Sequence, residues 1–129
     1  MPARPLIRIC YVEDDEDIQR IVRMSLERVG KMTVEVVGDP TKAIEAIAKF
    51  QPDLVMLDWM MPAMDGPTLF KQMKQRPETN ALPVVFITAK AAQRDLDELM
   101  KMGAAGTISK PFNPKDLPDQ LRAIWAKLP

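Results

Sequence analysis

Histidine is absent from this 129-residue chain, and cysteine occurs once, as Cys10. Without a histidine to activate it, the lone thiol lacks the usual base of a cysteine nucleophile, and a single cysteine cannot form an internal disulfide. Cys10 lies inside a short apolar run, so we interpret it as a core residue. The low cysteine content agrees with a reducing compartment, which predicts a cytoplasmic protein.

An excess of charge of one sign is also missing, because eighteen basic residues balance eighteen acidic ones. Without a positive field, neither nucleic acid nor an anionic membrane surface is an expected partner. No apolar run approaches the length of a membrane span, and the N-terminus lacks the apolar segment of a signal peptide. We expect a single domain, residues 1–129, which is long enough to bury a core without disulfides or metals.

What the sequence does contain is an alternation of short apolar runs with segments of helical period. The runs are too short for typical helices and are rich in β-branched residues, which predicts five strands: Leu6–Val12, Thr33–Val37, Leu54–Leu57, Val84–Ile87 and Thr107–Ile108. Five helices are predicted after these strands: one closed by Gly30, one from Asp39-Pro40, one from Asp65-Gly66 to before Pro77, one from Gln93 to Met102, and one from near Asn113-Pro114.

Two of these helices carry more detailed expectations. The first should turn one face inward, made by Ile18, Ile21, Val22, Ser25, Leu26 and Val29. In the last, Pro118 should distort the first turn or delay the start of the helix, because proline removes an intrahelical hydrogen bond.

Alternating strands and helices with continuous apolar strands predict a parallel sheet covered on both faces, which is a three-layer α/β sandwich. For five strands the flavodoxin-like order 2-1-3-4-5 is the common arrangement, a (βα)5 fold. In such sheets ligands bind at the carboxyl ends of the strands, where the first and third strands diverge. Functional side chains are therefore expected at that edge.

Five consecutive carboxylates, Glu13 to Asp17, follow the first predicted strand. Taken alone, such a run is more often the solvated start of a helix, where acidic residues complement the helix dipole. Two carboxylates about 5 Å apart, however, repel by roughly 3 kcal/mol at an effective dielectric near 20. If several of these carboxylates converge on one point, a compensating cation is expected.

The ends of the other strands supply groups that fit this expectation. Glu13 and Asp14 end the first strand, Asp58 the third and Thr88 the fourth, while Lys110 follows the fifth. Carboxylate oxygens with waters suit Mg²⁺ bound together with a phosphoryl group. Asp58 could act as a carboxylate nucleophile toward phosphorus, with the Lys110 ammonium and the Thr88 hydroxyl on the phosphoryl oxygens.

At this point the sequence resembles the receiver domains of bacterial two-component response regulators, over essentially the whole chain. The resemblance rests on the acidic pair after the first strand, the segment DWMMPAMDG that begins at Asp58, and Lys110-Pro111, a pair whose peptide bond is often cis in that family. A member of the family is itself an example of the 2-1-3-4-5 order, so the two expectations are not independent.

The resemblance implies a role for each matching position. It makes Asp58 the phosphoacceptor, Thr88 the switch hydroxyl and Lys110 the phosphate-binding lysine. It also implies a Mg²⁺ site made by four groups: Glu13, Asp14, Asp58 and the backbone carbonyl of Met60.

The function implied is that of a stand-alone regulator, since no chain follows the last predicted helix to serve as an output domain. A histidine kinase or histidine phosphotransfer protein should donate the phosphoryl group, and the signal should leave through changed protein–protein contacts. The usual output face in the family is formed by the fourth helix, fifth strand and fifth helix, and activation could include homodimer formation. Beyond its own phosphorylation and dephosphorylation, no enzyme activity is expected.

Two alternatives remain open from the residues alone. A phosphoaspartate hydrolase of the haloacid-dehalogenase type uses a similar set but places a second Asp two residues after the first, where this chain has Met60, which cannot donate a proton. A receiver-like binding module without phosphorylation is the other alternative. The chain also departs from many receivers at Thr107, where an aromatic residue is common, and Met60 and Lys90 occupy positions that tune phosphoryl lifetime in the family.

Overall fold

The apolar runs form the strands of one parallel sheet. The computed structural model describes residues 4–88 and 93–128. The strands are β1 (Arg8–Val12), β2 (Thr33–Val37), β3 (Leu54–Asp58), β4 (Val84–Thr88) and β5 (Gly106–Ser109). Their order is β2-β1-β3-β4-β5, with every neighbouring pair parallel. The predicted strand order is confirmed.

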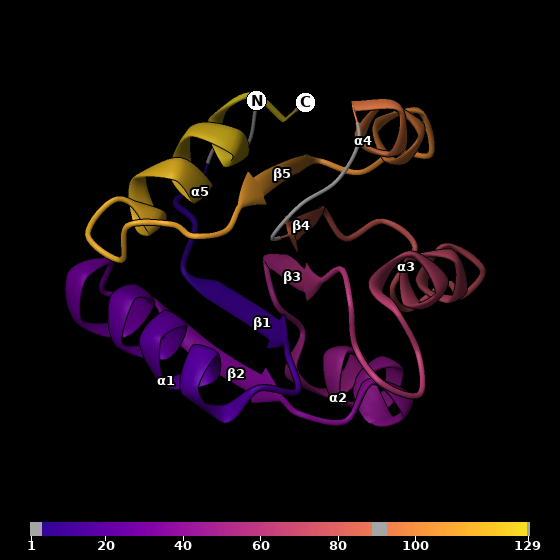
Figure 1. Ribbon diagram of the computed structural model, residues 1–129, viewed down its shortest axis with the longest axis horizontal. Coiled ribbons are helices and arrows are strands. Elements are labelled where there is room, and N and C mark those ends of the chain that lie inside the picture. The colour runs from indigo at the N-terminus through magenta and orange to yellow at the C-terminus, as the bar shows by residue number, and fades with distance from the viewer. Residues whose placement is uncertain (1–3, 89–92, 129) are drawn as a thin grey trace.

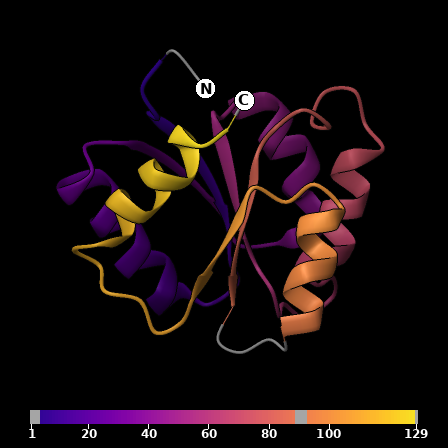
Figure 2. The ribbon, with the colours of Figure 1, turned by 90° about the horizontal axis from the view of Figure 1, so that it is seen from above.

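Helices cover both faces of this sheet, which makes three layers (Figures 1 and 2). They are α1 (Glu16–Met24), α2 (Ala43–Phe50), α3 (Gly66–Lys74), α4 (Gln93–Lys101) and α5 (Leu117–Ala126). A π-helical turn, Ser25–Val29, continues α1, and a 3-10 turn, Pro40–Lys42, precedes α2. Figure 2 shows α1 and α5 on one face and α2, α3 and α4 on the other. Within the described residues, no helix has the length and apolar character that crossing a bilayer requires.

Each face of the sheet has its own hydrophobic core, because side chains alternate along a strand. On β1, Ile9 and Tyr11 belong to the core under α1 and α5, while Cys10 and Val12 belong to the core under α2 and α3. Cys10 is fully buried, as predicted. Burial raises the pKa of its thiol to about 12, so Cys10 remains a neutral core residue.

The helices differ from the sequence prediction in two places. Ile21 and Val29 were expected to face inward but are 46% and 52% exposed; the buried stripe consists of Val22, Ser25 and Leu26, and the π-helical turn changes the period on which the expectation rested. The last helix begins at Leu117 with a proline in its first turn, so its start is delayed rather than distorted. Asp39 is the N-cap before Pro40, as predicted, and Asp65 is the N-cap of α3, with its carboxylate accepting from the Thr68 N–H.

Close packing of α3 against the end of β3 requires glycine at position 66. A Cβ on Gly66 would lie 2.3 Å from the backbone oxygen of Asp58. We expect Gly66→Ala to lower the free energy of unfolding by about 3 kcal/mol, because backbone cannot yield as a flexible side chain can. Gly38→Ala is the matched control, since its Cβ would meet the flexible side-chain end of Gln19 at 3.3 Å and would lie 4.0 Å from the nearest backbone atom, the Glu13 oxygen. Equal losses in both variants, measured by denaturant unfolding, would contradict this packing argument.

The opposite edge of the sheet is held by Asp53. Its carboxylate accepts hydrogen bonds from the backbone N–H groups of Ile7 and Arg8, and it pairs with Arg4. Although burial acts in the other direction, these donors hold the pKa of Asp53 below its ordinary value. Asp53 thus stabilises the fold above the unfolded-state pKa of about 4, and this contribution is lost as the pH falls through the lowered folded-state pKa.

Asp53→Asn tests this contribution through its pH dependence. We expect the variant to lose about 1–2 kcal/mol of unfolding free energy at pH 7, and the difference from the parent to shrink as the solution is acidified. Asp119→Asn serves as the control, because Asp119 is exposed and pairs with Arg122 at only 3.9 Å. A difference that stays constant from pH 7 to pH 3 would show that the Asp53 charge is not what stabilises this edge.

Candidate functional site

The predicted functional residues lie at one edge of the sheet, where the parallel strands end. Glu13 and Asp14 directly follow β1, Asp58 is the last residue of β3, and Thr88 is the last residue of β4. Lys110 directly follows β5, and its backbone N–H donates to the backbone oxygen of Thr88 at 2.8 Å. The strands therefore bring together residues that are up to 97 positions apart in the sequence.

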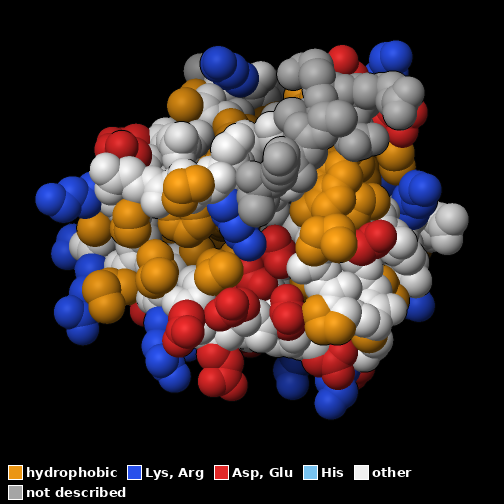
Figure 3. Space-filling view, in the orientation of Figure 1, with side chains coloured by type: hydrophobic (Ala, Val, Ile, Leu, Met, Phe, Trp, Pro, Cys, Tyr) orange, Lys and Arg blue, Asp and Glu red, His pale blue; other side chains and the backbone are white. Residues whose placement is uncertain are grey.

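Three carboxylates form the centre of this site. Glu13, Asp14 and Asp58 each offer a carboxylate oxygen, and these oxygens lie within 4.8 Å of one another. Glu13 and Asp58 are buried, at 1% and 5% exposure, whereas Asp14 is exposed. Figure 3 shows acidic side chains gathered near the middle of one face of the molecule, beside a basic side chain and between hydrophobic ones.

Lys110 reaches into this cluster from the loop after β5. Its Nζ lies 2.9 Å from Oδ1 of Asp58 and 3.3 Å from Oε1 of Glu13. Burial disfavours the charged ammonium, but the two carboxylates outweigh it, so the pKa of Lys110 is raised and the side chain stays protonated. The Lys110-Pro111 peptide bond is cis, in agreement with the expectation for this pair.

The charges of the site favour a divalent cation. Three carboxylates and one ammonium leave two negative charges in excess at neutral pH. The donor set is entirely oxygen, the kind that Mg²⁺ prefers, with room for waters on the exposed side of Asp14. Burial, with a smaller contribution from the neighbouring carboxylates, raises the pKa values of Glu13 and Asp14 above their ordinary values.

The five acidic residues after β1 divide into two groups. Glu13 and Asp14 belong to the carboxylate cluster, whereas Asp15, Glu16 and Asp17 are exposed at the start of α1. Asp15 is the N-cap, and its carboxylate accepts from the N–H groups of Asp17 and Ile18. Asp17 lies in the first turn of α1. The acidic run is therefore both a helix start and part of a site.

Sequence reasoning missed two residues that hold Glu13 in place. The Tyr11 hydroxyl donates to Oε1 of Glu13 at 2.8 Å, and the Gln19 side-chain amide donates to the Glu13 backbone oxygen. The two-residue period of a strand could have placed Tyr11 on the same face as Glu13. For Gln19, six residues further on, the sequence carries no such signal.

The residues next to Asp58 point in different directions. Trp59 is half-buried, and its ring lies edge-on to Phe86 with the ring centroids 6.0 Å apart. Met60 is 74% exposed in the loop after β3, so it does not fill the core, unlike the buried Met56.

Two positions at which the chain was compared with other receivers lie on or after neighbouring strands. Thr107 is half-buried on β5, where it pairs in register with Phe86. Lys90, which was expected to influence phosphoryl lifetime, lies outside the described residues.

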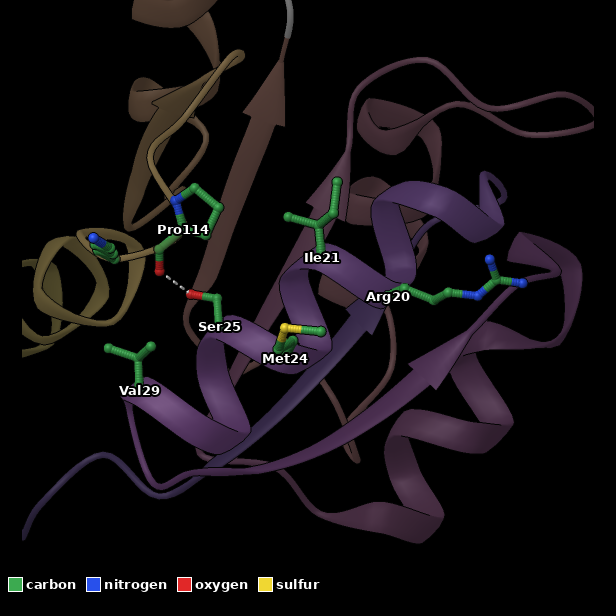
Figure 4. Close-up of a pocket in the computed structure, with 7 residues that line it drawn as sticks. Arg20, Ile21, Met24, Ser25, Val29 and Pro114 are labelled. Atoms are coloured by element: carbon green, nitrogen blue, oxygen red, sulfur yellow. Dashed lines mark hydrogen bonds between the residues drawn. The ribbon is translucent and has the colours of Figure 1, made fainter.

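An apolar hollow of about 350 Å³ lies between α1 and the loop that joins β5 to α5 (Figure 4). Ile21, Met24 and Val29 line it from the α1 side, and Pro114 lines it from the loop. The Ser25 hydroxyl donates to the Pro114 backbone oxygen across its floor. The exposure of Ile21 and Val29, unexpected from the sequence, thus creates an apolar surface beside the loop that carries Lys110.

Fold and site together define a class: an α/β domain with a cluster of carboxylates bridged by a lysine at the carboxyl edge of a parallel sheet. A family model, the response regulator receiver domain, matches residues 9–122. The chain belongs to this family. Receiver domains are signalling domains that bind Mg²⁺ at an acidic pocket, and the three clustered carboxylates form such a pocket here.

Individual relatives agree with this assignment. The phosphate regulon transcriptional regulatory protein PhoB of Escherichia coli (strain K12) is 35% identical over 121 residues, which are 94% of this chain and 52% of that protein. PhoB of Rhizobium meliloti (strain 1021) is 32% identical over 119 residues, which are 92% of this chain and 52% of that protein. The chain thus spans about half the length of the curated relatives it matches.

Solved structures show the same fold. The chemotaxis protein CheY4 of Vibrio cholerae superimposes with a TM-score of 0.84 at 26% identity, over 92% of this chain and 98% of that one. A response regulator from Desulfuromonas acetoxidans gives a TM-score of 0.83 at 24% identity, over 95% and 99% of the two chains. At that identity the second likeness shows the fold alone.

Proposed function

We propose that this receiver domain accepts a phosphoryl group on Asp58 from a phosphohistidine donor in a Mg²⁺-dependent reaction, and signals through changed protein contacts. The observation that carries the proposal is the position of Lys110, whose ammonium lies 2.9 Å from Asp58 within a cluster of three carboxylates. Because the Asp58 carboxylate is buried and ion-paired with Lys110, it is held in position for attack. Such an arrangement suits phosphoryl transfer, which depends on positioning and electrostatic stabilisation.

In the proposed reaction an oxygen of Asp58 attacks the phosphorus, and an acyl phosphate forms. The bond from phosphorus to the donor imidazole breaks, and its electron pair stays with the imidazole nitrogen. Lys110 donates to the new acyl phosphate, and the Thr88 hydroxyl, at the end of the neighbouring strand, is the proposed donor to a phosphoryl oxygen. Both groups stabilise charge that develops during transfer.

Glu13, Asp14, Asp58 and the Met60 backbone carbonyl are the proposed groups that hold Mg²⁺. When bound there, Mg²⁺ would supply positive charge that offsets the charge of the phosphoryl oxygens. The exposed Asp14 is open to solvent and can bind an entering cation directly, while the buried Glu13 is fixed by its neighbours.

Receiver domains interact with histidine kinases and with downstream targets. For this chain we propose a kinase or histidine phosphotransfer protein that covers the apolar hollow between α1 and the β5–α5 loop, because that loop also carries Lys110 and so adjoins the acceptor. The downstream target is proposed to contact α4, β5 and α5, with self-association as one form of output. That this domain functions without an attached output domain stays a prediction. Residues 89–92, the loop after β4, lie outside the described residues.

A phosphoaspartate hydrolase is less well supported. It needs a proton donor two residues after the nucleophile, and Met60 at that position carries no titratable group. We therefore propose that the chain does not turn over outside substrates and that its chemistry is limited to its own phosphorylation and dephosphorylation.

The proposal is tested by incubating the purified protein with Mg²⁺ and a small acyl phosphate. Intact-mass measurement should show the gain of one phosphoryl group, and a chelator that removes Mg²⁺ should prevent it. No gain with Mg²⁺ under conditions that label another receiver domain would reject phosphoacceptance and favour the alternative of a binding module.

Asp14→Ala tests the metal site separately from phosphorylation. In a Trp125→Phe background Trp59 is the only tryptophan, and it adjoins the proposed ligand Asp58. We expect Mg²⁺ to change its fluorescence, and Asp14→Ala to weaken Mg²⁺ binding tenfold or more, about 1.4 kcal/mol, because a charged ligand is lost. Glu16→Ala, in the exposed first turn of α1, is the control. An unchanged titration in Asp14→Ala would mean that the acidic run is only a solvated helix start.

A further inference from the structure

Tyr11 is the only tyrosine in the chain, and its ring is fully buried in the core under α1 and α5. A buried tyrosine needs a partner for its hydroxyl, because an unpaired polar group in the core is costly. Here that partner is Oε1 of Glu13 at 2.8 Å. The strand places residues 11 and 13 on the same face, so the hydroxyl extends from the apolar core to the carboxylate cluster.

The partners of Glu13 distinguish its two carboxylate oxygens. Oε1 accepts from the Tyr11 hydroxyl and from Lys110 Nζ at 3.3 Å, whereas among the described residues the donor to Oε2 is the backbone N–H of Asp15 at 3.2 Å. A carboxylate oxygen has about two acceptor positions. Oε1 is therefore fully used, and Oε2 retains an acceptor position for a cation or for a water bound to one.

We propose that Tyr11 is a positioning residue for the metal site: its hydroxyl holds Oε1 of Glu13 beside Lys110 and leaves Oε2 to face the cation. This inference rests on the proposed function, because it assigns a role toward the Mg²⁺ that phosphorylation requires. Groups that orient a metal ligand commonly change metal affinity by 10–100-fold when they are removed.

The buried environment of the Tyr11 hydroxyl agrees with a role as a hydrogen-bond donor. Burial, together with the charge of Glu13, raises the pKa of Tyr11 well above its ordinary value. Phenylalanine would preserve the packing of the ring in the core, so the hydroxyl can be removed almost alone.

The first test is the dissociation constant for Mg²⁺, followed by Trp59 fluorescence in the Trp125→Phe background. Tyr11→Phe should raise this constant about tenfold. Thr79→Val is the matched control, because it also removes a fully buried hydroxyl, one that donates to the Met73 backbone oxygen at 2.8 Å in the other core. The control should bind Mg²⁺ within twofold of the parent. A constant for Tyr11→Phe that is also within twofold overturns the proposal.

A double-mutant cycle separates positioning from a general effect on the fold. Glu13→Asp shortens the carboxylate by one methylene, so it can no longer reach the Tyr11 hydroxyl. In that background Tyr11→Phe should change the dissociation constant by less than about twofold. A tenfold effect in both backgrounds means that the hydroxyl does not act through Glu13, and this outcome also overturns the proposal.

A spectroscopic measurement gives a readout independent of activity. Labelling with ¹³C at Cζ of tyrosine yields a single resonance, from Tyr11, which reports on the hydrogen bond of its hydroxyl. We expect this resonance to shift with Mg²⁺ at the same midpoint as the Trp59 fluorescence, and to be displaced without metal in Glu13→Asp. If the resonance shifts neither on addition of Mg²⁺ nor in Glu13→Asp, while Trp59 fluorescence still reports Mg²⁺ binding, the proposed role of Tyr11 is overturned. If the parent gives no Mg²⁺ response by either method, the proposed metal site itself is rejected.

Discussion

Asp58→Asn should take up no detectable phosphoryl group from a small acyl phosphate under conditions in which the parent is fully labelled. The amide of asparagine has no anionic oxygen with which to attack phosphorus, whereas it keeps the size of the aspartate. Asp58 is buried at the end of β3, and Lys110 holds its carboxylate at 2.9 Å. Intact-mass measurement after equal incubation times checks this result.

Asp14→Asn is the matched control for this experiment. It removes a carboxylate from the same cluster but leaves the acceptor, so it should still be phosphorylated when the Mg²⁺ concentration is raised. Label that persists in Asp58→Asn would show that another group is the acceptor. Loss of label in both variants at every Mg²⁺ concentration would show that the experiment reports metal binding and not acceptor identity.

Lys110→Met should slow phosphorylation by about a hundredfold or more. Removal of a single donor aimed at developing charge typically costs 10²–10³ in rate. Lys110 has a second effect, because it bridges Asp58 and Glu13, at 2.9 and 3.3 Å. Without the ammonium the three carboxylates repel one another, which should also favour their protonation. Methionine keeps the length and apolar stem of lysine, so the loss of charge is the main change.

The initial rate of label uptake at saturating Mg²⁺ measures this effect. Lys115→Met is the control, because Lys115 is an exposed lysine in the same loop, and its rate with a small phosphodonor should lie within about twofold of the parent. A rate for Lys110→Met that is similar to the control would mean that the ion pair with Asp58 does not contribute to transfer.

Much of the fold follows from local sequence patterns. The buried strands β3 and β4 are continuous apolar runs, and this pattern is specific for the middle of a parallel sheet. The buried face of the first helix was less predictable. The π-helical turn at Ser25–Val29 shifts the helical period around Val29, which is exposed. Ile21, in the regular part of α1, is also exposed, beside the buried Val22.

The sequence was sufficient to predict which strand ends meet at the site. The carboxyl-edge rule brought Glu13, Asp14, Asp58 and Lys110 together, and the structure places their charged groups in one cluster. Hydrogen bonds within the cluster were not predictable, because they depend on side-chain rotamers. The choice of Asp15 rather than Asp17 as N-cap and the contact from Tyr11 to Glu13 are both of this kind.

The measurement that tests the central claim most directly is the location of the phosphoryl group. Borohydride reduces an aspartyl phosphate to homoserine, so peptide mass spectrometry of the phosphorylated and reduced protein identifies the acceptor. We predict homoserine at position 58 and at no other acidic residue, only in protein phosphorylated with Mg²⁺. Homoserine at position 14, 5-hydroxynorvaline at position 13, where the reduced residue would be a glutamate, or a stable phosphoryl group on a serine or threonine would contradict the assignment of Asp58 as the phosphoacceptor.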